Sequence, residues 1–148
     1  NKRNLKYLMT IGADTIFCID FLKHCSSAAG INKPLHYYRI RKNSSYHSII
    51  NKKRYLDYIR IYEDSRDLLQ GWNKLNDKNL YFITAVLYYS MKDCINIAVN
   101  SERASLQDRI EVVTTILADK KLRELLNHEK FFEALLDDGL MALNSMVK

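Results

Sequence analysis

The sequence predicts a mainly helical fold, and three observations lead to this prediction. Four glycines and one proline among 148 residues leave the chain with few of the residues that tight turns require. Apolar residues recur at spacings of three and four over most of the chain, as they do along the buried face of a helix. The hydrophobic share of 47% is sufficient for a core in a chain of this length.

The first region, residues 1–47, mixes two element types. A helix is expected over residues 14–29, where apolar positions repeat every three or four residues and Gly30 follows as a stop signal. Side chains then alternate over residues 35–40, which predicts a short strand entered through Pro34. We therefore expect a short α/β remnant, a helix plus a strand, in this region.

The second region, residues 48–148, predicts helices throughout. The connections between these helices look short, so neighbours should pack antiparallel as a small helical bundle. Asn76 or Asp77 should cap the second long helix of the chain, and Asp119 should cap a short later one. Gly139 interrupts the pattern of the last helix, so a break there is an open alternative.

Cysteine content and hydropathy indicate the compartment. The three cysteines, Cys18, Cys25 and Cys94, are an odd number without metal-like spacing, so we interpret them as buried thiols in a reducing compartment. No apolar run approaches the length of about 18 residues that a membrane span needs, and no signal peptide is evident. These features predict a cytoplasmic protein. Because the chain begins with Asn1 rather than methionine, we expect that it belongs to a longer protein.

The net charge of +6 is concentrated in one part of the chain. Between Lys33 and Arg60 the sequence has eight Lys and Arg residues and one acid, Asp57. Such a block favours phosphates, nucleic acid or an acidic membrane surface as a partner, although it can equally be a solvated helix face. Tyr55 and Tyr62 within it fit the buried stripe of a bundle helix better than a membrane-bound helix. Peripheral contact with the inner face of the membrane stays an alternative.

Most motif patterns of enzymes are missing from the sequence. It contains no glycine-rich phosphate loop, no HExxH and no paired CxxC, and its four histidines form no ligand-like cluster. One acid has an informative position, because Asp14 lies between Gly12 and an apolar run at the expected start of a helix. A carboxylate there can simply cap the helix. It can also be a reactive base, because the positive end of the helix dipole favours its ionised form.

The order of motifs over residues 12–48 resembles the C-terminal end of a family 2 glycosyltransferase catalytic domain of GT-A type. Members of that family carry G-E-D-x-x-F, followed after a helix by i-n-k-P-L-Y-x-Y-R-x-R-x-x-S. Residues 1–47 would then be the end of the GT-A domain, and residues 48–148 resemble the variable helical extensions of such enzymes. The matching positions are Gly12, Asp14, Phe17, Asn32, Lys33, Pro34, Leu35, Tyr38, Arg39, Arg41 and Ser44.

The resemblance assigns a chemical role to Asp14. Inverting sugar transfer needs a carboxylate that takes the proton from the acceptor hydroxyl as its oxygen attacks the anomeric carbon. Asp14 matches the base of the family motif, while helix capping stays the alternative. The family commonly has Glu immediately before the base, and this chain has Ala13, so the acceptor contacts of that position stay unassigned.

The basic loop and two histidines complete the expected site. By resemblance, Arg39, Arg41 and Ser44 contact the diphosphate of the donor. Arginines two apart in a strand point to the same face, as a shared ligand requires. The alternative is a basic edge strand that discourages aggregation. The resemblance also makes His36 and His47 candidates for the metal shell.

Missing parts limit what the chain can do alone. A GT-A enzyme holds Mg²⁺ or Mn²⁺ through an Asp-x-Asp motif beside a nucleotide-binding sheet, and this sequence contains neither Asp-x-Asp nor a recognisable βαβ unit. We therefore expect the ion in the complete enzyme, none bound to this fragment, and no activity of the fragment alone. The complete enzyme would take a nucleotide-sugar donor and a glycan or lipid-linked acceptor, for a bacterial-type surface or capsular glycan.

Two functions of other classes stay open. A non-enzymatic helical module could mediate homo-oligomerisation or membrane docking, and an exposed apolar patch or a dimer would favour it. A basic nucleic-acid-binding domain would bind polyanions with a steep salt dependence. UDP-selective, metal-dependent binding by the longer protein would count against this function, and we expect no nucleic-acid partner.

Overall fold

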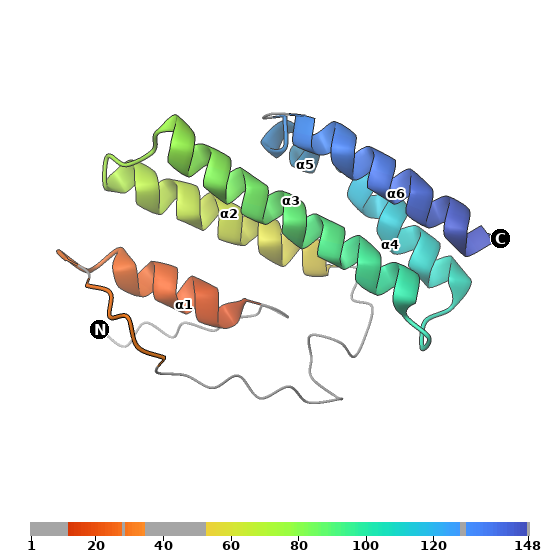
Figure 1. Ribbon diagram of the computed structural model, residues 1–148, viewed down its shortest axis with the longest axis horizontal. Helices are drawn as coiled ribbons and strands as arrows, with labels where there is room; N and C mark the ends of the chain where they lie inside the picture. The colour runs from red at the N-terminus through yellow and green to blue at the C-terminus, as the bar shows by residue number, and fades with distance from the viewer. Residues whose placement is uncertain (1–11, 28, 35–52, 128–129, 148) are drawn as a thin grey trace.

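The computed structural model describes residues 12–27, 29–34, 53–127 and 130–147, which form six α-helices and no strand (Figure 1). The mainly helical prediction is confirmed. The strand predicted over residues 35–40 lies outside the described residues. No helix in the described ranges is both long and apolar enough to cross a bilayer. The helices are α1 (Ala13–Leu22), α2 (Arg54–Gly71), α3 (Asp77–Asn100), α4 (Leu106–Ala118), α5 (Lys120–Leu125) and α6 (Phe131–Val147).

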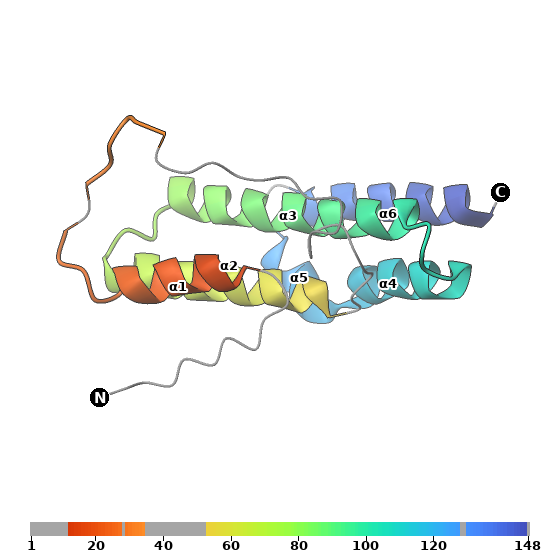
Figure 2. The same cartoon turned by 90° about the horizontal axis from the view of Figure 1, so that it is seen from below.

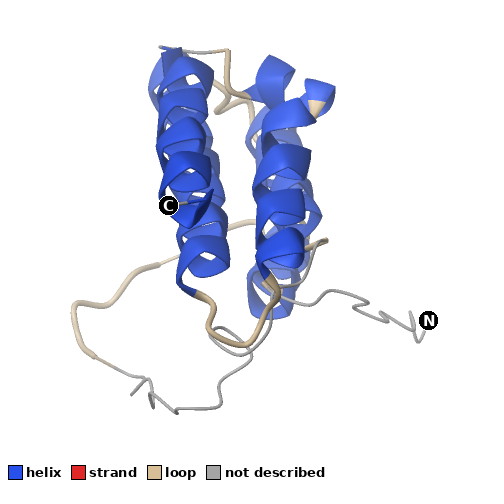
Figure 3. Cartoon of the chain, turned by 90° about the vertical axis from the view of Figure 1, so that its right-hand side faces the viewer, coloured by secondary structure: helices blue, strands red, loops and turns tan. Residues whose placement is uncertain are grey.

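The helices lie in two layers, and α3 is the central helix. Figure 2 shows α3 and α6 in one layer, with α1, α2, α4 and α5 in the other. Helix α3 packs against α2, α4 and α6, while α1 packs mainly against α2. Helices α2 and α3 run antiparallel, as predicted for neighbours joined by a short connection. Figure 3 shows the two layers from one end of the molecule.

The main core fills the space between the two layers. Most of its buried side chains come from α3, α4, α5 and α6, and α2 contributes Tyr55, Ile59 and Tyr62. The burial predicted for the two tyrosines is therefore confirmed. Each fully buried large apolar side chain stabilises the fold by about 1.5–3 kcal/mol. The most completely buried members include Met91, Val113, Leu122, Leu126 and Leu135.

Polar side chains cap the starts of three helices. Asn76 accepts a hydrogen bond from the backbone N–H of Asn79 at the start of α3. Asp119 accepts one from Leu122 at the start of α5, and the side chain of Ser105 caps α4 in the same way. Such caps contribute about 1 kcal/mol each. Asn76 is thus the cap of α3, and the prediction for Asp119 is confirmed.

Helix α1 is shorter than the apolar pattern predicts. The helix ends at Leu22 and not at residue 29. Tight turns follow, in which the backbone N–H of Cys25 donates to the carbonyl of Leu22. Residues 23–27 are mostly polar, and serine is a weak helix former. Little packing therefore supports a longer helix, and a short helix depends on packing for its stability.

The predicted burial of the cysteines is correct for one of them. Cys94 lies in the core with 5% of its surface exposed, whereas Cys18 is exposed and Cys25 is partly exposed. The prediction was wrong for Cys18 because α1 packs against α2 on another face. Burial raises the pKa of the Cys94 thiol to about 12. Cys94 therefore stays protonated and unreactive near neutral pH.

Gly139 lies inside α6 without breaking it. The helix is continuous through this position, and Gly139 is buried where α6 packs on α4. A Cβ atom at position 139 would lie 2.6 Å from Cδ1 and 2.8 Å from Cδ2 of Leu117. The glycine is therefore a packing residue that gives Leu117 its space, and the alternative of a helix break is wrong.

A hydrogen bond joins α2 to the start of α5. The Tyr55 hydroxyl donates to Oδ2 of Asp119 at 3.0 Å, and Oδ1 of the same carboxylate accepts from the N–H of Leu122 at 2.8 Å. Burial, followed by the hydrogen bond and the negative charge of Asp119, raises the pKa of Tyr55 from 10.0 to about 12. Asp119 thus caps α5 and also ties it to α2.

Replacing Gly139 by alanine should lower the free energy of unfolding by about 1 kcal/mol, although alanine is the better helix former by a similar amount. The added methyl group overlaps with both δ carbons of Leu117. Urea unfolding followed by circular dichroism measures the change. In the Gly139→Ala background, Leu117→Ala should cost less than it does in the wild type, because it removes the overlap. A more stable Gly139→Ala variant would contradict the packing role.

Stability in alkaline solution should depend on the proton of Tyr55. The unfolded chain loses this proton near pH 10.0 and the folded chain near pH 12, so the free energy of unfolding falls between these values. Tyr55→Phe should abolish this part of the pH dependence, a difference on the order of 2 kcal/mol. Urea titrations across the interval measure the slope. Tyr89→Phe, at an exposed position, is the control, and equal slopes for wild type and Tyr55→Phe would refute the assignment.

Candidate functional site

Gly12 is the N-cap of α1 and has a backbone conformation that favours glycine. The φ angle of Gly12 is 75°, in the left-handed region. Its carbonyl accepts a hydrogen bond from the N–H of Ile16 at 2.9 Å. A Cβ atom at this position would also clash with Cδ1 of Ile61 in α2. Glycine is therefore required here for the backbone angle and for the close approach of α2.

Asp14 lies in the first turn of α1 and is exposed to solvent. Its Oδ1 accepts a hydrogen bond from the backbone N–H of Thr15 at 2.9 Å. This contact satisfies one of the first-turn N–H groups that a helix leaves without an intrahelical partner. Asp14 therefore does stabilise the start of the helix, as the alternative interpretation expects. A carboxylate has about four acceptor positions. The accessible group can therefore also bind the hydroxyl of a ligand.

Asp14 shares the outer face of α1 with two phenylalanines. Positions 14, 17 and 21 are separated by three and four residues, which places their side chains on one face of the helix. Phe17 and Phe21 are 55% and 62% exposed, and their ring centroids are 6.5 Å apart. Ile16 and Ile19 are buried on a different face. A helix with apolar residues on two faces is typical of one that is covered on more than one side.

A small apolar cluster holds α1 on α2. It is separate from the main core and joins the inner face of α1 to Ile61 and Leu68 of α2. At the C-terminal end of α1, Nζ of Lys23 lies 3.5 Å from Oδ1 of Asp64, an exposed pair that contributes little by itself. The members of the cluster are Ile16, Ile19, Leu22, Ile61 and Leu68.

A cleft of about 150 Å³ opens where α1, α2 and α3 meet. Its walls are mainly aromatic and aliphatic, and the Ser65 hydroxyl on its lining donates within α2 to the carbonyl of Ile61 at 2.7 Å. The cleft leaves free space beside Thr15 in the first turn of α1. Its lining includes Thr15, Tyr58, Ile61, Tyr62, Phe82 and Ser90.

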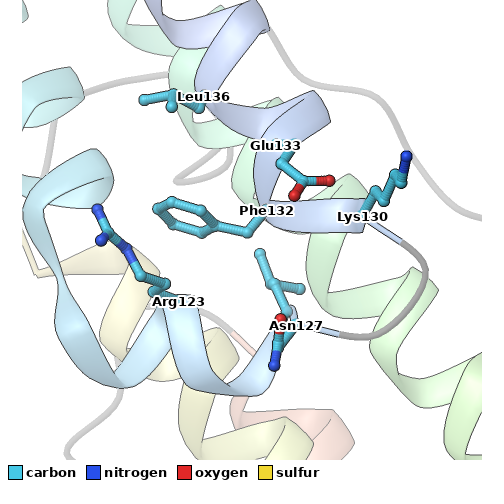
Figure 4. A pocket seen from close by; sticks show the side chains of 7 residues that line it. Arg123, Asn127, Lys130, Phe132, Glu133 and Leu136 are labelled. Atoms are coloured by element: carbon cyan, nitrogen blue, oxygen red, sulfur yellow. The ribbon is translucent and has the colours of Figure 1, made fainter.

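A second cavity, of about 500 Å³, lies between α5 and α6 (Figure 4). The guanidinium of Arg123 lies 4.9 Å from the centroid of the Phe132 ring, which forms one wall. Lys130 and Glu133 bring one positive and one negative charge to the lining. Residues 128–129, which connect the two helices, lie outside the described residues. We therefore assign no function to this cavity.

The other predicted site residues cannot be placed beside Asp14. His36, Arg39, Arg41, Ser44 and His47 all lie outside the described residues. Within the part of the chain that is described, no group of three His, Cys, Asp or Glu side chains could hold a metal ion. The described residues alone thus do not form the Mg²⁺ or Mn²⁺ site expected of a complete enzyme.

Ile61 is the site residue that sequence reasoning missed. It lies seven residues before Leu68 on α2, so both side chains reach the same face of that helix. This pair runs beside the main buried stripe and faces α1. A second apolar row on α2 was the signal that could have identified it.

Comparisons with known proteins supply no relative for this chain. It has no significant match among protein-family models, curated proteins or solved structures. Its function is therefore inferred from the residues and the geometry described above.

Proposed function

We propose that this chain is the C-terminal portion of an inverting glycosyltransferase of GT-A type, with Asp14 as the catalytic base. The observation that carries the proposal is an accessible carboxylate in the first turn of a helix whose start is fixed by Gly12. The family-like order of Gly12, Asp14 and Phe17 supports it. The proposal requires a nucleotide-binding half in the same protein, and this portion alone would be inactive.

The proposed reaction is a single displacement at the anomeric carbon. The oxygen of the acceptor hydroxyl attacks this carbon while its bond to the diphosphate oxygen breaks. Asp14 takes the proton of the hydroxyl, and the electron pair of the broken bond leaves with the nucleoside diphosphate. General base catalysis of this kind contributes about 10²–10⁴-fold to a rate.

The leaving diphosphate gains negative charge, so fixed cations near it would lower the barrier. Arg39, Arg41 and Ser44 are the proposed contacts to the diphosphate, on the strength of the family resemblance. Mg²⁺ or Mn²⁺ would supply further positive charge in the complete enzyme. His36 and His47 are the proposed ligands of this ion from the present chain. The proton transfer to Asp14 does not involve the ion.

The exposed phenylalanines of α1 support a further layer of protein over this helix. Phe17 and Phe21 lie on the same face as Asp14 and are more than half exposed. Leaving apolar surface in water costs about 25 cal/mol for each Å². A nucleotide-binding half that covers this face would bury both rings and bring the donor sugar toward Asp14.

A non-enzymatic interaction module is the second candidate function. Helix α3 presents Phe82, Val86 and Tyr89 at spacings of four and three, and the two aromatic side chains are each 65% exposed. Such a row on one helix face is typical of a surface that binds another protein. In this alternative, two copies of the chain pair through α3.

In the protein that joins this chain to its nucleotide-binding half, Asp14→Asn should reduce turnover by about 10²-fold or more, because asparagine cannot accept the proton. Donor affinity should stay close to that of the wild type, since Asp14 acts on the acceptor. Release of UDP from candidate UDP-sugars with Mn²⁺ measures turnover, and calorimetric titration measures donor binding.

Asp20→Asn is the matched control for this experiment. Asp20 lies on the same helix and forms a surface ion pair with Lys23 at 3.5 Å, so its replacement should leave turnover unchanged. Wild-type turnover in a folded Asp14→Asn variant would mean that Asp14 is only a helix-terminal acid.

If α3 mediates self-association, Phe82→Ser combined with Tyr89→Ser should convert a dimer into a monomer. Both changes remove exposed aromatic surface at positions outside the main core, although the ring centroid of Tyr89 lies 5.0 Å from that of the core residue Tyr88. Light scattering coupled to size-exclusion chromatography measures the molar mass. Leu140→Ser, at an exposed position of α6, is the control. A wild-type chain that stays monomeric at high concentration would rule this function out.

A further inference from the structure

Helix α2 reaches the start of α1 through the contact between Ile61 and Gly12. A Cβ atom at position 12 would overlap with Cδ1 of Ile61, so the isoleucine lies directly against the glycine backbone. Asp14 follows two residues later. Ile61 of α2 therefore lies against the residue that starts the turn which carries the proposed base.

Two hydrogen bonds link the residues of this first turn to one another. The carbonyl of Gly12 accepts from the N–H of Ile16 at 2.9 Å, and the carboxylate of Asp14 accepts from the N–H of Thr15 at 2.9 Å. A displacement of the Gly12 backbone is thus passed on to Asp14. A misplacement of about 1 Å at a catalytic group can cost about 10²-fold in rate.

The other contacts of α1 with α2 act further along the helix. Ile16 and Ile19 pack with Leu68, which lies two helical turns beyond Ile61 on α2. Ile61 packs against the same cluster, and of these two α2 side chains only Ile61 also lies within 4 Å of a Cβ atom placed at Gly12.

Ile61 also lies outside the main core. It is partly exposed and belongs to the small cluster between α1 and α2. The cleft of about 150 Å³ adjoins it and reaches Thr15. A shorter side chain at position 61 would give the first turn of α1 room to move, while the core between the two layers stays intact.

We propose that Ile61 is a positioning residue for Asp14, so that the helical region takes part in catalysis by setting the place of the base. The inference rests on the proposed function, since it presumes that Asp14 is that base. Ile61 acts through Asp14, which takes the proton of the acceptor hydroxyl in the proposed reaction. Its replacement should therefore change the chemical step and leave donor binding as it was.

The test measures kcat and the donor KM of Ile61 variants in the complete protein. Ile61→Ala should lower kcat by about 10-fold or more while the donor KM stays close to wild type. Ile61→Leu keeps the side-chain volume and should recover most of kcat. Leu56→Ala makes a comparable truncation at an exposed position of the same helix and should leave both constants unchanged.

A thermal melt of each variant accompanies the kinetics. If Ile61→Ala does not fold, Ile61→Val takes its place, because it removes only the Cδ1 that touches Gly12, and its kcat should fall several-fold. A wild-type kcat in the folded Ile61 variant would overturn the inference. An equal loss in Leu56→Ala would also overturn it.

The same series separates this inference from the function on which it rests. If Asp14→Asn loses most of its turnover while Ile61→Ala keeps the wild-type kcat, the positioning role of Ile61 is refuted and Asp14 stays the proposed base. Unchanged turnover in Asp14→Asn would remove the proposed function, and the positioning role with it.

Discussion

The contact between the bare backbone of Gly12 and the side chain of Ile61 is the constraint on which the placement of α1 depends. The left-handed φ of 75° turns the chain into the helix, and the missing side chain lets α2 approach the backbone directly. Any larger residue would push α1 away from α2 at the end that carries Asp14. One contact thus fixes the start of the helix and leaves its first-turn carboxylate accessible.

Stability and proposed chemistry reside in different parts of the molecule. The core between the two layers contains α2, α3, α4, α5 and α6, and the bond between Tyr55 and Asp119 ties α5 to α2. Helix α1 contributes only to the small cluster on the outside of α2. Its other face carries Asp14 with Phe17 and Phe21. In the proposed function, a further layer of protein covers this outer face, while the core between the two layers involves no residue of α1.

The caps predicted correctly from sequence depend on local signals, whereas the error at Gly139 and the missed role of Ile61 depend on contacts between distant segments. Asn76 and Asp119 are caps because their side chains reach N–H groups three residues away. The continuity of α6 at Gly139 depends on Leu117 of another helix, and no periodicity contains that information. For the site, the sequence located Asp14 at a helix start. The contact of Ile61 with Gly12 could not be predicted from the sequence, because it depends on how α1 packs on α2.

Single-turnover transfer tests most directly whether Asp14 takes the proton of the acceptor. The complete protein is saturated with donor before the acceptor is added, so donor binding does not enter the measured rate. We expect Asp14→Asn to slow this single turnover by about 10²-fold or more, with the helical content unchanged. A single-turnover rate equal to that of the wild type would contradict the assignment of Asp14 as the base.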